Sequence, residues 1–206
     1  MLGSAGRAWV RVPAGADGRS LPLVVALHGA GGRPQGMLTM LAAVADREGL
    51  LVLAPQSART SWDMIQGRYG PDVHLLDAAL TQVLEEHAVD PARLAVSGFS
   101  DGASYALSLG ITNGDLFSHV LAWSPGFVGP VVPHGRPQLF VSHGTRDEVL
   151  SVDRCSRRLV PVLEAAGYVV DYHEFGGPHS VPPDVLDRSI RWFLSPAEAS
   201  SITTAE

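Results

Sequence analysis

Six short and nearly continuous apolar runs, separated by segments with helical spacing, constrain the fold of this 206-residue chain most strongly. Such runs are typical of strands that are buried on both faces, as in a parallel sheet. They cover residues 21–27, 50–54, 93–97, 119–123, 138–142 and 169–175. Residues 8–12 alternate between apolar and polar side chains, which favours an antiparallel edge strand.

Between these runs, apolar residues recur every three or four positions, as on one face of a helix. The spacing predicts helices over residues 36–48, 73–86, 102–109, 152–166 and 183–194. Strand and helix alternate throughout, and no linker divides the chain. We therefore expect one α/β domain over residues 1–194, with a mostly parallel sheet and helices on both faces. Residues 195–206 are small and polar without periodicity, so we expect a flexible tail there.

The composition excludes several classes of function. Fifteen basic and 21 acidic residues give a net charge of −6, which argues against a nucleic-acid partner. All the basic residues are arginine, so mechanisms that need a lysine amine are excluded. The histidines lack metal-ligand spacing, and we expect neither a metal nor a cofactor. No apolar run is long enough to span a membrane and no signal-peptide pattern is present, so we expect no membrane partner and, by default, a cytoplasmic location; a chain trimmed of its signal would look the same.

The run that ends at Ser97 is followed by Gly98-Phe99-Ser100-Asp101-Gly102 and then by a predicted helix. G-x-S-x-G between a strand and a helix is the pattern of a sharp turn that presents a nucleophilic serine above the sheet. The residues that flank the serine must be small, because a Cβ atom would clash in so tight a turn. The pattern predicts Ser100 as a nucleophile; the alternative is a glycine-rich turn that merely contains a serine.

Asp147 and His179 follow two other predicted strands, at their carboxyl ends. Either residue alone would be read as a helix cap or a surface histidine. The chain order of serine, acid and histidine is, however, the order that accompanies this serine turn. Since sites in such sheets form at the carboxyl ends of the strands, we expect Ser100, Asp147 and His179 to meet in a catalytic triad.

The first long run ends in Leu27-His28-Gly29-Ala30-Gly31-Gly32. A glycine-rich loop at this place can offer backbone N–H groups to an oxyanion. We assign the N–H groups of Ala30 and Asp101 as the oxyanion hole, and we expect His28 to pack or hydrogen-bond beneath it. A dinucleotide-binding loop is excluded because Pro34 stands where G-x-G-x-x-G needs glycine.

These segments resemble the α/β-hydrolase superfamily, in particular the phospholipase/carboxylesterase family and the esterases related to polyhydroxybutyrate depolymerases. The resemblance spans residues 8–194. It is carried by residues 27–32, 89–102, 61–63 with Asp72-Val73, and 142–147, together with His179. Asp101 replaces the usual Gln or Ala after the nucleophile, and Pro178 replaces the commoner Gly before the histidine. An acid beside an oxyanion hole adds unfavourable charge unless it is paired or turned away.

The resemblance implies a serine carboxylesterase that acts through an acyl-enzyme, without a cofactor, on a small-molecule ester. The same catalytic residues would also serve a thioesterase or an amidase. A catalytically silent binding module is the alternative that is not an enzyme. Only twelve residues separate Ser124 from Pro137, too few for a helical cap, so we expect an open site for short acyl chains. Four apolar residues either line it or pack in the core: Trp62, Met64, Trp123 and Phe127. The sequence leaves the oligomeric state open.

Overall fold

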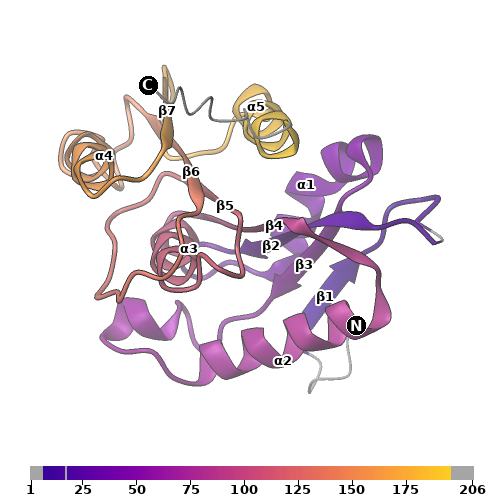
Figure 1. Ribbon diagram of the computed structural model, residues 1–206. Coiled ribbons are helices and arrows are strands. Elements are labelled where there is room, and N and C mark those ends of the chain that lie inside the picture. Colours follow the sequence, from indigo (N-terminus) through magenta and orange to yellow (C-terminus); the bar gives the residue numbers. More distant parts are fainter. Residues whose placement is uncertain (1–6, 17, 196–206) are drawn as a thin grey trace, which may run out of the picture.

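A single seven-stranded sheet forms the centre of the computed structural model, which describes residues 7–16 and 18–195 (Figure 1). The spatial order is β1-β3-β2-β4-β5-β6-β7. β1 pairs antiparallel with β3, and the other neighbours are parallel, as the sequence predicted. The strands are β1 (Ala8–Arg11), β2 (Leu21–Leu27), β3 (Leu51–Pro55), β4 (Val89–Phe99), β5 (His119–Trp123), β6 (Gln138–Gly144) and β7 (Val170–Phe175).

The helices are α1 (Pro34–Glu48), the short 3₁₀ helix η1 (Asp63–Gln66), α2 (Pro71–Glu86), α3 (Asp101–Thr112), α4 (Ser156–Ala165) and α5 (Pro183–Leu194). Proline at the first helical position fixes the start of α1, α2 and α5. α4 begins four residues later than predicted, because residues 151–155 form turns whose N–H groups bond back to Ser151. Cys155 is therefore the half-buried residue before this helix, not part of its packed face.

Helices cover both faces of the sheet, so each central strand is buried on two sides (Figure 1). Alternate side chains of β2 show the division. Leu23, Val25 and Leu27 pack in a cluster with α2 and α3, whereas Val24 and Ala26 pack in a second cluster with α1 and α5. This period of two within an unbroken apolar run is what a doubly covered parallel strand requires.

The chain order of the strands reverses at β2. From β2 the chain moves outward to β3 and then crosses back to β4 on the other side of β2. In open α/β sheets such a reversal creates a crevice at the carboxyl ends of the strands, and the loops after β2 and β4 meet there. The tail expected over residues 195–206 lies, apart from Ser195, outside the described residues.

Candidate active site

Ser100 occupies a strained turn between β4 and α3. Its φ of 58° and ψ of −121° lie in a region that side-chain-bearing residues rarely adopt. The turn closes so tightly that a Cβ atom on Gly98 would lie 2.2 Å from the backbone of Gly102, and one on Gly102 would lie 2.2 Å from the carbonyl oxygen of Leu27. Glycine at both flanking positions is therefore a steric requirement of the turn.

A line of hydrogen bonds joins Ser100, His179 and Asp147, which follow three different strands. His179 Nε2 lies 2.9 Å from Ser100 Oγ, and His179 Nδ1 lies 2.5 Å from Asp147 Oδ2. The carboxylate can only accept, so Nδ1–H donates to Asp147 and Nε2 is left to accept the Ser100 hydroxyl proton. Asp147 is 7% exposed, and its other oxygen accepts the N–H groups of Val149 and Leu150.

His143, which the sequence did not single out, lies beneath the aspartate. The ring is fully buried, and its Nε2–H donates to the carbonyl oxygen of Leu150 and lies 3.3 Å from Asp147 Oδ2. Its Nδ1 accepts the hydroxyl of Ser156, and burial lowers the pKa of His143, so the ring stays neutral. Its position four residues before Asp147, at the end of β6, is the signal that sequence reasoning passed over.

The loop after β2 runs against the serine turn. A Cβ atom on Gly29 would lie 3.3 Å from Ser100 Cβ, so the loop that carries Ala30 runs beside Ser100. Within residues 7–16 and 18–195, the N–H groups of Ala30 and Asp101 make no hydrogen bond. The Asp101 carboxylate is turned to the side, where it accepts the hydroxyl of Ser61 at 2.5 Å. The hydroxyl is a neutral donor, so this bond fixes the direction of the carboxylate and leaves its charge in place.

His28 holds the start of this loop, as its position suggested. Its Nδ1–H donates to the carbonyl oxygen of Gly29, and its Nε2 accepts the N–H of Ser57 and the side-chain amide of Gln56. Burial lowers the pKa of His28, which keeps Nε2 free to accept these two donors. The loops after β2 and β3 are therefore tied together below their surface.

Asp72, which is buried, and Asp63, which is half-buried, brace the segment between β3 and α2. Asp63 accepts the N–H groups of Gly70 and Asp72 and the hydroxyl of Tyr105, while Asp72 accepts the N–H groups of Ala58 and Asp63. Burial raises the pKa of Asp72, and these N–H bonds act against that rise. Both carboxylates are thus occupied in holding the chain around Ser61.

Several solved structures of esterases are similar to this chain. An esterase named PE8 matches with a TM-score of 0.74 at 21% identity, covering 90% of this chain and 96% of that one. A phospholipase/carboxylesterase from Dyadobacter fermentans matches with a TM-score of 0.66 at 23% identity, covering 92% of this chain and 96% of that one. The chain has the α/β-hydrolase fold.

Sequence comparison adds one relative. A bifunctional acetylxylan esterase/xylanase of Neocallimastix patriciarum is 29% identical over 138 residues, which are 63% of this chain and 20% of that protein. The chain thus spans about one fifth of that relative's length. No protein-family model matches the sequence.

Most of the four apolar residues expected to line the site or pack in the core do the latter. Trp62 and Trp123 have no exposed surface and Met64 is 4% exposed, so these three follow the core alternative. Trp62 instead stacks on Tyr105 and donates its indole N–H to the carbonyl oxygen of His28. Only Phe127 presents an exposed side chain, at 43%. Side chains of β5 alternate between the two core clusters, and this puts Trp123 against α5, which the sequence pattern did not reveal.

Two open hollows lie at the carboxyl edge of the sheet. One, of about 440 Å³, is lined by His179, Arg146, Glu148, Val149 and Pro178. Val149 is 68% exposed there and gives this hollow an apolar wall that the sequence analysis missed. The other lies beside the loop after β2 and is lined by residues of two loops. His179 therefore borders an open hollow, whereas the half-buried Ser100 lines neither of the two.

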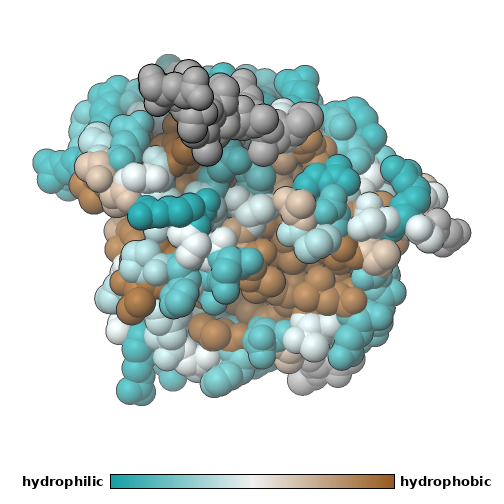
Figure 2. Space-filling model, viewed as in Figure 1, coloured by the Kyte–Doolittle hydropathy of each residue, from teal (hydrophilic) through white to brown (hydrophobic). Residues whose placement is uncertain are grey.

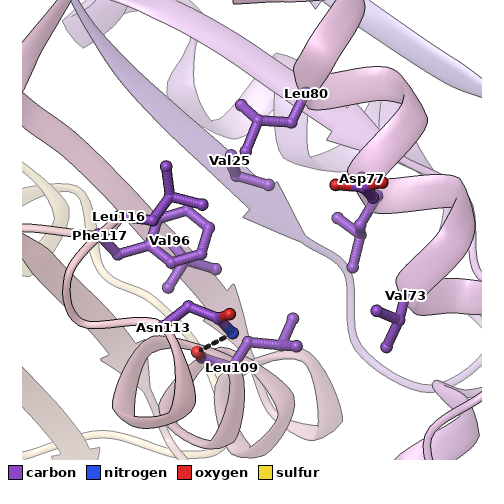
Figure 3. Close-up of a pocket in the computed structure, with 10 residues that line it drawn as sticks. Val25, Val73, Asp77, Leu80, Val96, Leu109, Asn113, Leu116 and Phe117 are labelled. Carbon is purple, nitrogen blue, oxygen red and sulfur yellow. Dashed lines mark hydrogen bonds between the residues drawn. The ribbon is translucent and has the colours of Figure 1, made fainter. Parts of the chain in front are cut away.

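A separate apolar hollow of about 90 Å³ opens between α2 and α3 (Figure 3). Its floor is Val25 and Val96, in the middle of β2 and β4, and Leu80 and Leu109 wall it. Apolar side chains gather above α2 on this face (Figure 2). None of the residues proposed for the reaction lines it, so it is not part of the candidate active site.

The described part of the chain holds no group of three or more His, Cys, Asp or Glu residues placed to bind a metal ion. Within the same residues, no helix is both long and apolar enough to cross a bilayer.

Proposed function

We propose that the chain is a serine carboxylesterase that hydrolyses short-chain esters through Ser100, His179 and Asp147. The observation that carries the proposal is the line of hydrogen bonds from Asp147 through His179 to Ser100, next to the unengaged N–H groups of Ala30 and Asp101. The fold alone would not suffice, because one fold supports many functions and the site must decide among them.

In the proposed acylation, Ser100 Oγ attacks the ester carbonyl carbon while His179 Nε2 takes the hydroxyl proton. The carbonyl π electrons move to oxygen, and the resulting oxyanion accepts hydrogen bonds from the N–H groups of Ala30 and Asp101. The ester C–O bond then breaks as His179 gives its proton to the leaving alcohol. The product of this half-reaction is an acyl group on Ser100.

Deacylation repeats the steps with water. The oxygen of the water molecule attacks the acyl carbon while His179 takes a proton from the water. The bond between the acyl carbon and Ser100 Oγ then breaks as His179 returns the proton to the serine. Asp147 accepts Nδ1–H throughout, which keeps Nε2 as the base and stabilises the imidazolium. The contact of His143 with Asp147 Oδ2 makes His143 a positioning residue for the acid.

The nucleophile and base are tested with p-nitrophenyl esters. Ser100→Ala and His179→Ala should each lower kcat by about 10⁴-fold or more, and the double variant should be scarcely worse, because the pair acts as a unit. Ser118→Ala, at the opposite end of the sheet, is the control and should keep full activity. Full activity in folded Ser100→Ala would overturn the proposal.

Matched substrates test the bond type. Thioester and anilide counterparts of the preferred ester are measured with the wild-type protein. We expect the ester to have the highest kcat/KM. A higher value for the thioester or the anilide would assign the same residues to a thioesterase or an amidase instead.

A further inference from the structure

A hollow of about 410 Å³ adjoins the loop that carries the Ala30 N–H. Gly31, Gly32 and Arg33 line it from the loop after β2, and Gln56, Arg59 and Thr60 line it from the loop after β3. The Gly31 N–H donates to the carbonyl oxygen of Thr60 at 2.6 Å, so the two loops form one surface. Because Gly31 follows Ala30 directly, this surface begins one residue from the proposed oxyanion hole.

The charge of this hollow is opposite to that of the whole chain. The net charge is −6, yet the hollow is lined by two arginines and no carboxylate. Among the residues that the structure describes, the side chains of Arg33 and Arg59 are exposed, and their guanidinium groups have no hydrogen-bond or ion-pair partner. Elsewhere, Arg11 pairs with Asp46, and Arg157 pairs with Asp153 and Glu174. The exposed guanidinium of Arg158 on α4 is unpaired within the described residues, so what distinguishes Arg33 and Arg59 is that they line one hollow.

The N-terminus of α1 adds to the positive charge around this hollow. α1 begins at Pro34, directly after Arg33, and has neither an acidic residue in its first turn nor a side-chain cap. The N-terminus of a helix carries a partial positive charge. An adjoining hollow of about 250 Å³ shares Arg59 and adds Arg68. Its two carboxylates, Asp63 and Asp72, accept backbone N–H groups but keep their negative charge, so the positive charge is confined to the first hollow, which has no carboxylate in its lining.

We propose that Arg33 and Arg59 bind a carboxylate carried by the ester substrate, a few bonds from the scissile carbonyl. The guanidinium fork matches a carboxylate, and two unpaired forks beside the reaction site favour an anionic ester over a neutral one. This inference rests on the proposed esterase function. It deepens that function by naming the substrate class: an ester that retains one free carboxylate in its acyl or alcohol part.

The experiment compares neutral and anionic esters of matched size. For the acyl part, the pair is 4-nitrophenyl butyrate and mono-4-nitrophenyl succinate. For the alcohol part, it is methyl 4-acetoxybenzoate and 4-acetoxybenzoate. The ratio of kcat/KM, anionic over neutral, is measured for the wild-type protein, Arg33→Gln, Arg59→Gln and the double variant. Arg158→Gln removes an exposed arginine from α4 and is the matched control.

In at least one pair, the wild-type ratio should exceed one. It should fall about threefold in each single variant and about tenfold in the double variant, as expected for partly exposed charge pairs. Raising the salt concentration should also lower the wild-type ratio, because salt screens the charges. Arg158→Gln should leave both kcat/KM values unchanged. The pair that responds tells whether the carboxylate belongs to the acyl or the alcohol part.

The failure of this inference differs from the failure of the esterase proposal. If neutral esters are hydrolysed but both ratios are the same in the wild type and the double variant, the carboxylate site is wrong and the esterase proposal stands. If no ester is hydrolysed, the esterase proposal fails. The site is then judged by calorimetric titration of monomethyl succinate. Binding that the double variant loses supports the site, and the absence of binding to the wild type overturns it.

Discussion

Asp147 uses both of its carboxylate oxygens. Oδ1 accepts two backbone N–H groups, which fix the side chain, and Oδ2 faces His179 and His143. Asp147→Asn should keep the fold but lower kcat by about 10⁴-fold, because an amide would stabilise the wrong imidazole tautomer. The measurement is kcat together with circular dichroism.

Asp153 is the control for the acid. It is exposed, pairs with Arg157 at 2.7 Å and lies just before α4. Asp153→Asn should retain wild-type kcat. If Asp153→Asn instead inactivates the protein while Asp147→Asn does not, the acid has been assigned to the wrong residue.

The buried side chain of His119 makes the stability of the protein depend on pH. It is 8% exposed among Trp192 and Phe193, and burial lowers its pKa from 6.5 to about 4. The unfolded chain therefore binds this proton more tightly than the folded chain does. The contribution of neutral His119 is complete above about pH 6.5 and is lost as the pH falls toward about 4, a change of at most about 3 kcal/mol.

Urea unfolding between pH 7 and pH 4 tests this. The free energy of unfolding should decrease as the pH is lowered from 7 to 4. His119→Phe should make this decrease smaller, because an apolar ring remains and the titrating group is gone. The slope should not vanish, since burial also lowers the pKa values of His28 and His143. His134→Phe, at an exposed position, should keep the wild-type slope. An unchanged slope in His119→Phe would contradict the assignment.

At the scale of elements, the turn between β4 and α3 depends on two glycines. A methyl group on Gly102 would meet the backbone of Leu27 at 2.2 Å, and a backbone cannot move aside as a flexible side chain can. Gly102→Ala should lower the free energy of unfolding by about 3 kcal/mol and displace Ser100 from the loop after β2. Thermal and urea unfolding, followed by kcat, measure both effects.

Gly36 is the matched glycine. It lies in the first turn of α1, and a Cβ atom there would meet nothing within 4 Å. Gly36→Ala should stabilise the protein by up to about 1 kcal/mol, because alanine loses less entropy in a helix. Equal stability changes in the two variants would show that close packing at the turn is not what requires glycine.

At the scale of the whole molecule, the loop between β5 and β6 contains no helix that could serve as a lid. Exposed apolar side chains at this edge are few, chiefly Phe127 and Val149, so a long acyl chain finds little wall against which to bury its methylenes. A buried CH₂ contributes about 0.8 kcal/mol only where such a wall exists. We therefore expect kcat/KM to be highest between acetyl and hexanoyl esters.

The p-nitrophenyl ester series measures this dependence on acyl length. Phe127→Ala should reduce the preference for butanoyl and hexanoyl over acetyl, because it removes one of the two apolar side chains. No increase in rate is expected at a lipid interface. A maximum at dodecanoyl or longer, or activation by emulsified triglyceride, would show that the site has an apolar cover.

The sequence by itself determined the strands, the helices and the placement of Ser100, Asp147 and His179 at strand ends. These features follow from local physics: burial on two faces gives unbroken apolar runs, and a tight turn requires glycine at positions 98 and 102. Chain order and sheet geometry then predict that the three residues meet. The late start of α4 escaped prediction, because a turn and a first helical turn have the same apolar spacing.

Only the tertiary structure decided which side chains face the site. Trp62 and Trp123 carry the same apolar pattern whether they line a pocket or fill the core, and burial against Tyr105 and α5 settles the question. The turning of Asp101 toward Ser61, and the lining of one hollow by both Arg33 and Arg59, bring together residues that lie far apart in the sequence. Such contacts depend on how the loops fold over the sheet edge, and no local spacing in the chain records that.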